Sequence, residues 1–407
     1  MVWYLNETSP SAYHFFYFST MFITAPRIHN GTHWLPAGTT LDMADDGTIQ
    51  AILAAPTNDT VHYDGVLCPG FVNVHCHLEL SHMKGVIPEH TGLIPFLQNV
   101  TAHRNDHTTE DKEEARHKAY YELLNNGIVA VGDIANTTDT LDIRELDELH
   151  FNTFIESIGF TAARAELSFG FAVKTYEAFA AQPSKTKVLR QSITPHAPYS
   201  VSSALFRLID AHNEGGLIAI HNQESEAEGQ FYRSKEGDVR ELLKGLGIDD
   251  SLFTPTGLSS IRSYLEWMTP GRPFVFVHNT YTTEEDIIYT HGRSADVAWC
   301  LCPNANLYIE NRLPDIDLLM KHSNNLCIGT DSLASNHQLS VMAELYSIRQ
   351  QYPHIGWEML LTWATSNGAR ALKMGDIVGT IEVGKAPGIV QVTGIEGDGL
   401  PVVVRVG

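Results

Sequence analysis

Residues 71–82 read FVNVHCHLELSH, an apolar run that ends in two histidines separated by one cysteine. Alternate side chains of a β-strand project from the same face, so the imidazoles of His75 and His77 would converge there. Two neutral imidazoles arranged in this way form a pair of metal ligands. The first question is which other residues complete the site.

Other polar side chains stand where further short apolar runs end. His196, His221, His278 and Asp331 each occupy such a position. A single histidine among the 20 of this chain is more often a core or surface residue than a ligand. In a (β/α)8 barrel, however, catalytic groups lie at the C-terminal ends of the strands. Imidazoles combined with one carboxylate suit one transition metal, Zn²⁺ first and iron second, and disfavour Mg²⁺ and Ca²⁺.

The segment HNQESEAEG adds a carboxylate close to this set, because Glu224 lies three residues after His221. A carboxylate beside a metal, without necessarily binding it, is placed for general acid–base catalysis. We expect Glu226 and Glu228 of the same run to be mobile surface residues.

The elements that must position these side chains alternate in type from residue 66 to about residue 373. Helical patterns such as 108–127 and 202–216 separate short β-rich runs, which predicts a parallel sheet with crossover helices. Eight strands over roughly 300 residues correspond to an α/β fold of the (β/α)8 TIM-barrel type. The predicted strands are 70–75, 127–134, 151–158, 190–196, 217–223, 273–279, 297–303 and 326–332.

The two ends of the chain are rich in Thr, Val, Ile and turn residues. We predict that 1–65 and 375–407 combine into one small composite β-sandwich beside a barrel formed by 66–374. Within the first segment, 44–52 reads as a hairpin around Asp-Gly, and the apolar stretch 15–25 reads as a strand pair.

Composition restricts the partners. With 43% apolar and 18% charged residues the chain has a globular balance, and its formal charge of −21 disfavours nucleic acid and anionic membranes. We therefore expect a small-molecule substrate, and a homodimer is possible. The five scattered cysteines are predicted to be buried thiols in a reducing, cytoplasmic compartment.

These motifs, in this order, resemble the amidohydrolase superfamily. The resemblance rests on PGFVNVHCH (69–77), HNQE (221–224), FVHNT (276–280), CPNANLYI (302–309), GTDSLASN (329–336) and GTIEVGKAPG (379–388). It implies that one catalytic metal is bound by His75, His77, His221 and Asp331. It further implies that Glu224 and His278 act on the substrate and on water.

The resemblance also favours a single metal. Some members of the superfamily hold a second metal through a carboxylated lysine at the end of the third or fourth strand, and FIESIGF (154–160) and SITPHAPY (192–199) contain no lysine. The usual Ala-Asp-Leu near the C-terminus is Pro387-Gly388-Ile389 in this chain, which affects the predicted sandwich and no catalytic residue.

Within the superfamily, His-x-His followed by His-x-x-Glu resembles deaminases of purine-like rings and triazine chlorohydrolases. HLELS (77–81) with GLIPFLQNV (92–100) resembles aminofutalosine deaminases. The implied reaction is hydrolytic deamination of an adenine-type ring in a small nucleoside, with aminofutalosine preferred. Alternatives are S-adenosylhomocysteine, adenosine or guanine deamination and triazine dechlorination. A non-catalytic scaffold is disfavoured because Glu224 and all four ligand types are present.

In this mechanism the bound metal would lower the pKa of water from about 15.7 to about 7. Asp331 and His278 would orient the nucleophile, and Glu224 would carry a proton to the ring nitrogen and then to ammonia. The predicted substrate-binding residues are His196, Glu79, His82 and Asn306. For Glu79 and His82, loop packing is an equal alternative. A benzoate-bearing substrate also requires a cation, and the candidates are Arg233 and Arg312.

Overall fold

The computed structural model describes residues 20–406, and the eight predicted parallel strands are present among them. Their ends shift by a few residues from the expected ranges. The strands are β7 (Phe71–Cys76), β8 (Ile128–Ala135), β9 (His150–Ser157), β10 (Leu189–Pro195), β11 (Ile218–Asn222), β12 (Phe274–His278), β13 (Val297–Leu301) and β14 (Leu326–Ile328). Every residue of β7, β8 and β9 is buried, as expected for parallel strands covered on both faces.

The ladders divide these strands into two four-stranded parallel sheets, β10-β9-β8-β7 and β11-β12-β13-β14. In the described residues the ladder is therefore not one closed barrel, although backbone hydrogen bonds connect the two sheets where β10 meets β11 and where β14 meets β7. His221 N donates to His196 O over 3.0 Å at one seam. Thr330 N and Asp331 N both donate to His75 O over 3.0 Å at the other. Both seams thus join strand ends that carry the predicted site residues.

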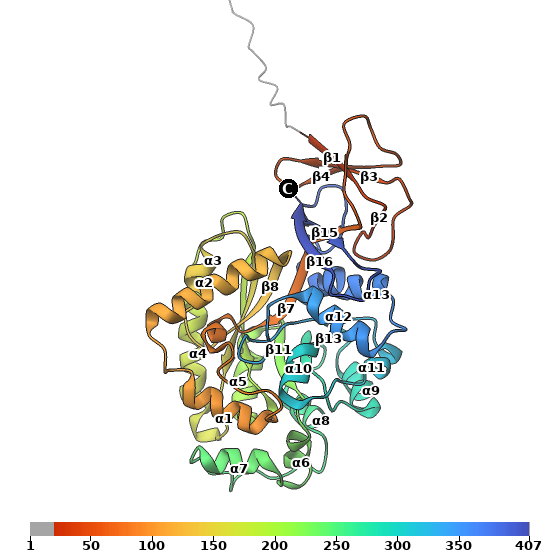
Figure 1. Ribbon diagram of the computed structural model, residues 1–407. Helices are drawn as coiled ribbons and strands as arrows, with labels where there is room; N and C mark the ends of the chain where they lie inside the picture. The colour runs from red at the N-terminus through yellow and green to blue at the C-terminus, as the bar shows by residue number, and fades with distance from the viewer. Residues whose placement is uncertain (1–19, 407) are drawn as a thin grey trace, which may run out of the picture.

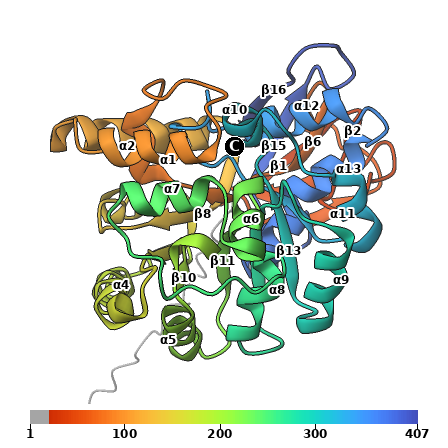
Figure 2. The ribbon, with the colours of Figure 1, turned by 90° about the horizontal axis from the view of Figure 1, so that it is seen from below.

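Helices lie around the outside of these strands (Figure 2). The predicted helices 108–127 and 202–216 are confirmed as α2 (Thr109–Asn125) and α5 (Ser203–Asn213). Thr108 and Asp111 form a capping box that fixes the beginning of α2. The remaining helices are α1 (Leu93–His103), α3 (Leu141–Arg144), α4 (Ala165–Ala180), α6 (Glu226–Ser234), α7 (Asp238–Gly245), α8 (Ser260–Tyr264), α9 (Glu284–Arg293), α10 (Pro303–Glu310), α11 (Ile316–His322), α12 (Val341–Gln351), α13 (Trp357–Thr362) and α14 (Gly368–Ala371).

Strands from both ends of the described chain form two further sheets, ordered β4-β3-β1-β5 and β16-β15-β6-β2. Figure 1 shows the N-terminal strands in red beside the C-terminal strands in blue. These strands are β1 (Thr20–Thr24), β2 (Arg27–Ile28), β3 (Thr40–Ala44), β4 (Ile49–Leu53), β5 (Val61–His62), β6 (Val66–Pro69), β15 (Ile389–Thr393) and β16 (Val402–Val406).

Two local predictions fall in these sheets. The hairpin expected at 44–52 is present as the antiparallel pair β3 and β4, and Gly47 supplies the positive φ of 83° that the turn requires. Of the strand pair expected at 15–25, β1 covers Thr20–Thr24, while residues 15–19 lie outside the described residues.

The five cysteines are all buried free thiols, as predicted. Among the residues that the structure describes, no helix combines the length and apolar character needed to cross a membrane.

Candidate active site

Four side chains from distant parts of the chain converge at the C-terminal ends of the strands. Nε2 of His77 lies 3.1 Å from Nε2 of His75 and 3.2 Å from Nε2 of His221. Oδ1 of Asp331 lies 3.4 Å from Nε2 of His77 and 3.6 Å from Nε2 of His75. One ligand atom from each of the four residues lies within 4.8 Å of the others.

The local backbone explains this convergence. His75 belongs to β7 and His77 follows the last residue of that strand, so their side chains share a face. Asp331 lies beyond the end of β14, in the left-handed region with φ of 56°. Its backbone N–H donates to His75 O, and Ser335 Oγ donates to its Oδ2 over 2.6 Å. The carboxylate is therefore held against β7 although the strand itself is short.

The donor set of this cluster requires a positive charge at its centre. Nδ1 of His221 lies 2.8 Å from His196 O and so carries a proton, which directs Nε2 towards the cluster as an acceptor. Burial lowers the pKa of His75 to about 4 and of His77 to about 3, so both imidazoles are neutral. Lone pairs and a carboxylate this close repel one another unless a cation lies between them. The residues fit a divalent metal.

The raised pKa of His221 also indicates that the cluster favours a positive charge. Burial lowers its pKa, but the nearby Glu156 carboxylate outweighs burial and raises the pKa to about 9. Without a metal, a proton on His221 would therefore supply the charge. A bound cation replaces that proton.

Glu224 and His278 form a second pair beside the cluster. Oε1 of Glu224 lies 3.6 Å from Nε2 of His278, and the two residues are 5% and 1% exposed. Burial raises the pKa of Glu224 to about 8 and lowers that of His278 to about 3. Neither ring nitrogen of His278 has a hydrogen-bond partner among the described residues. The pair can therefore hold and hand over a proton next to a bound metal.

Glu156 is a site residue that sequence reasoning missed. It lies near the end of β9, and its Oε1 is 3.2 Å from Nδ1 of His221, while Asn136 Nδ2 donates to its Oε2 over 2.9 Å. Glu156, His196 and His221 bring one polar atom each within 4.8 Å of one another. The missed signal is a charged residue at the end of an apolar run, the same pattern that singled out the histidines.

A cavity of about 600 Å³ opens over the cluster. His77, His196, His221, Glu224 and His278 line it, together with Asp331 and Glu156. An apolar wall faces them, formed by side chains that include Leu93, Phe96, Leu97, Phe160, Leu242 and Leu243. The cavity thus joins a polar, metal-binding floor to an apolar wall.

The cations on the cavity differ from those expected. Arg104 and Arg164 line it, and neither guanidinium forms an ion pair within residues 20–406. Arg233 and Arg312 are absent from its described lining, and the guanidinium of Arg312 lies 4.5 Å from the ring centroid of Tyr281. Arg233 and Arg312 therefore lie outside the described lining of this cavity, and their suggested role in binding a carboxylate stays a prediction.

Three of the predicted substrate-binding residues lie off the described cavity wall. Glu79 accepts from the backbone N–H of Asn136 over 3.0 Å and of Thr137 over 2.7 Å. His82 Nε2 contacts the backbone carbonyl of Arg104 at 3.0 Å. Asn306 donates to Thr280 Oγ1 over 2.6 Å.

Glu226 and Glu228 were both expected at the surface, and the structure contradicts this for Glu228 alone. Glu226 is exposed, as expected, whereas Glu228 is fully buried. Glu228 lies in α6 on the side that packs against α8, so it is not a mobile surface residue.

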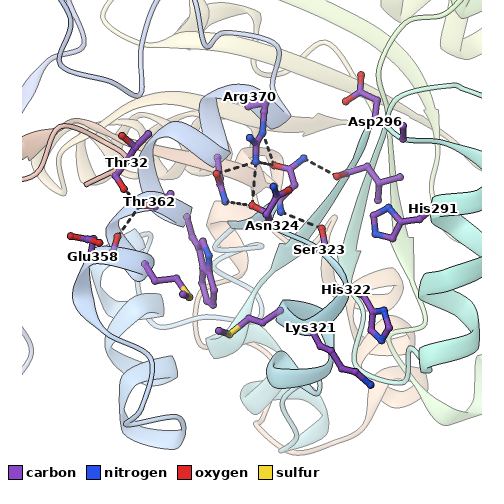
Figure 3. A pocket seen from close by; sticks show the side chains of 17 residues that line it. Thr32, His291, Asp296, Lys321, His322, Ser323, Asn324, Glu358, Thr362 and Arg370 are labelled. Atoms are coloured by element: carbon purple, nitrogen blue, oxygen red, sulfur yellow. Dashed lines mark hydrogen bonds between the residues drawn. The ribbon is translucent and has the colours of Figure 1, made fainter. Parts of the chain in front are cut away.

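A second cavity, of about 890 Å³, lies elsewhere (Figure 3). Asp296 and Asn325, which directly precede β13 and β14, place it at the N-terminal ends of those strands. Lys321 pairs with Glu284, and Arg370 donates to Asn325 Oδ1, so these polar groups are already satisfied. None of the described groups of metal-ligating side chains lies in this second cavity. The cavity is also at the end of the strands opposite to the one where the active sites of (β/α)8 barrels lie.

Known proteins resemble this chain over most of its length. An aminodeoxyfutalosine deaminase of a Nitratiruptor species is 26% identical over 332 residues, covering 81% of this chain and 78% of that protein. An adenosine deaminase of Helicobacter pylori is 24% identical over 327 residues, covering 79% and 77%.

Solved structures show the same fold. Helicobacter pylori aminofutalosine deaminase in complex with methylthio-coformycin matches with a TM-score of 0.76 and 20% identity over 91% of each chain. An adenosine deaminase from Xanthomonas campestris with bound zinc matches with a TM-score of 0.73 and 23% identity, covering 92% of this chain and 84% of that one. The sequence profile of the amidohydrolase family matches residues 66–405. The chain belongs to the amidohydrolase family.

Proposed function

We propose that this protein is a metal-dependent hydrolase that deaminates the adenine-type ring of a small nucleoside, with aminofutalosine as the leading substrate. The observation that carries the proposal is the placement of the Glu224–His278 pair beside the four-residue ligand cluster on the floor of one cavity. Relatives named as aminodeoxyfutalosine, adenosine and 5-methylthioadenosine/S-adenosylhomocysteine deaminases support this reaction class.

His75, His77, His221 and Asp331 would hold one divalent metal, for which zinc is our proposal. When bound, the metal would lower the pKa of water and so supply a nucleophile at neutral pH. Asp331 and His278 orient that nucleophile towards the amine-bearing ring carbon. Glu224 gives its proton to the adjacent ring nitrogen, takes up the proton that the attacking water loses and gives that proton to the amine. The proton of the new hydroxyl group returns to the carboxylate as the carbonyl forms. Addition of water followed by cleavage of the C–N bond releases ammonia and leaves a carbonyl group.

The far end of the cavity supports a substrate with an aromatic acid. The apolar wall suits an aryl group, and Arg104 and Arg164 provide cations for a carboxylate. We propose that His196, which lines the cavity, contacts the substrate. Glu79, His82 and Asn306 would act on the substrate indirectly, through the loops that they hold.

The proposed architecture places this site in a closed (β/α)8 barrel over 66–374, with 1–65 and 375–407 combining into a β-sandwich. The backbone bonds at the two seams support the barrel. The pairing of β6 with β2 and β15 supports a sheet built from both ends of the chain, which extends to Pro69, four residues beyond the proposed boundary. Five free thiols support a cytoplasmic location. The net charge of −21 supports the further proposal that nucleic acid and anionic membranes are not partners.

The test is ammonia release from zinc-loaded protein, screened across aminofutalosine, adenosine, S-adenosylhomocysteine, guanine, cytosine and an aminotriazine. Ultraviolet spectra would follow the conversion of adenine to hypoxanthine directly. We expect aminofutalosine to give the highest kcat/KM. Efficient turnover of adenosine or S-adenosylhomocysteine with inert aminofutalosine would overturn the substrate assignment. No ammonia from any ring would overturn the deaminase class.

A further inference from the structure

Gln223, the residue immediately before Glu224, has a left-handed backbone with φ of 46°. This region is unfavourable for a residue with a Cβ atom and persists only where surrounding contacts enforce it. Because the backbone of Gln223 sets the direction in which Glu224 leaves β11, the contacts that enforce this conformation also place the Glu224 carboxylate.

The carboxylate of Glu228 provides the contact at the backbone. Its Oε1 accepts the Gln223 N–H over 3.0 Å and also accepts the hydroxyl of Ser260, the first residue of α8. Glu228 is fully buried and is not among the described residues that line the cavity, so it does not touch the substrate there. Its Oε2 has no hydrogen-bond partner among the described residues. Burying a carboxylate in this state is costly.

The side chain of Gln223 is fixed independently. Its Nε2 donates to Asp286 Oδ2 over 2.9 Å, and its Oε1 accepts from Thr282 Oγ1 over 2.7 Å. Its backbone carbonyl accepts from Tyr281 N over 2.9 Å. Thr282 and Tyr281 follow β12, the strand that ends in His278, so Gln223 ties the loop of Glu224 to the loop of its partner.

We infer that Glu228 is a positioning residue, which holds Gln223 in its left-handed conformation and thereby sets the Glu224 carboxylate against His278. The expected effect on kcat rests on the proposed function. The placement of Glu224 by Glu228 and Gln223 does not depend on it. The plain alternative is that Glu228 only stabilises the beginning of α6, where an acidic residue is favourable. That role would change stability and leave turnover unaffected.

The experiment compares Glu228→Ala and Glu228→Gln, with Glu226→Ala as the matched control because Glu226 is exposed on the same helix. Glu228→Ala removes the acceptor, so we expect kcat to fall on the order of 10-fold or more, below the roughly 10²–10⁴-fold of a lost acid–base group. KM and bound metal should stay near the wild-type values. Amide exchange at Gln223 should become faster. Glu228→Gln keeps an acceptor oxygen and should rescue both kcat and exchange.

Wild-type kcat and unchanged Gln223 exchange in Glu228→Ala would overturn the inference. An equal loss of kcat in the Ala and Gln variants would also overturn it, because the negative charge of Glu228, rather than its hydrogen bond to the Gln223 N–H, would then be responsible. If Glu228→Ala does not fold, Glu228→Asp, which withdraws the acceptor by one methylene, is judged by the same criteria. If the wild type deaminates nothing, the proposed function fails. Exchange at Gln223 and the crystallographic position of Glu224 in the variants then still decide whether Glu228 places that side chain.

Discussion

Oε1 of Glu224 lies 3.6 Å from Nε2 of His278, across the gap between two adjacent parallel strands. His278 ends β12, and Glu224 leaves the loop that follows β11. With opposite shifts in pKa, to about 8 for Glu224 and about 3 for His278, the carboxyl holds the proton and the imidazole is neutral. This is the arrangement expected of a proton carrier beside an orienting base.

The first prediction concerns that pair. Glu224→Gln should keep the fold and the metal but lose roughly 10²–10⁴-fold in kcat, because an amide does not shuttle a proton. His278→Ala should show a similar loss with metal retained. Steady-state kinetics with elemental analysis of the same samples would check this. Near-wild-type turnover of either variant would show that its role is misassigned.

The sequence predicted the eight strands and the strand-end residues well, for a physical reason. Parallel strands that are covered on both faces are mostly apolar, so a polar residue such as His75 or His221 at the end of an apolar run stands out. Asp331 was found for the same reason, although β14 ends at Ile328 and the carboxylate lies on the following loop.

Other features depend on contacts between distant segments and were not visible in the sequence. Glu228 was expected at the surface because charged residues are mostly exposed, yet it is buried, where it accepts hydrogen bonds from Ser260 and from the Gln223 backbone. Arg104 directly follows α1, and Arg164 ends a short 3-10 helix directly before α4, so both cations reach the cavity from segments far from the fifth and seventh strands. Loop conformation decides such placements.

The second prediction concerns Glu156, which contacts Nδ1 of His221 opposite the metal-facing nitrogen. Partners of this kind orient a ligand and raise its basicity, and their loss typically costs about 10–100-fold in metal affinity. The Glu156→Gln variant should therefore bind zinc about 10–100-fold more weakly, with Glu224 and His278 unchanged. Competition with a chelator of known affinity measures the change. Unaltered zinc affinity would contradict the role.

The third prediction concerns the close approach of β7 and β8. A Cβ added at Gly132 would lie 2.1 Å from the backbone oxygen of Val74, the residue before His75. Gly132→Ala should therefore destabilise the fold by about 1–3 kcal/mol and weaken metal binding by displacing β7. Gly170→Ala is the matched control, because Gly170 lies in α4 with no atom within 4 Å of the added Cβ. Urea unfolding of both variants tests this, and equal stability would count against it.

The fourth prediction concerns metal removal. Thorough chelation should abolish activity and lower Tm, because a ligand that binds only the folded state stabilises it. One equivalent of zinc per chain should restore both, and His77→Ala should not respond. Calorimetry and elemental analysis measure these effects. Two metals per chain in fully active protein, or full activity after chelation, would contradict a single catalytic metal.

The last prediction concerns discrimination between substrates. If Arg104 and Arg164 bind a carboxylate at the far end of the cavity, their loss should affect only substrates that carry one. Arg104→Ala and Arg164→Ala should each raise KM for aminofutalosine, by roughly 10-fold for the loss of one charge-assisted hydrogen bond, and leave kcat/KM for adenosine unchanged. Arg233→Ala and Arg312→Ala are the matched controls, because neither arginine is among the described residues of the cavity. Equal loss on both substrates would mean that the two arginines stabilise the fold, and no loss on either would mean that the carboxylate binds elsewhere. Deamination of adenosine uses the same metal and the same Glu224–His278 pair. The ratio of kcat/KM for aminofutalosine to kcat/KM for adenosine therefore separates the contribution of the far end of the cavity from that of the chemical step.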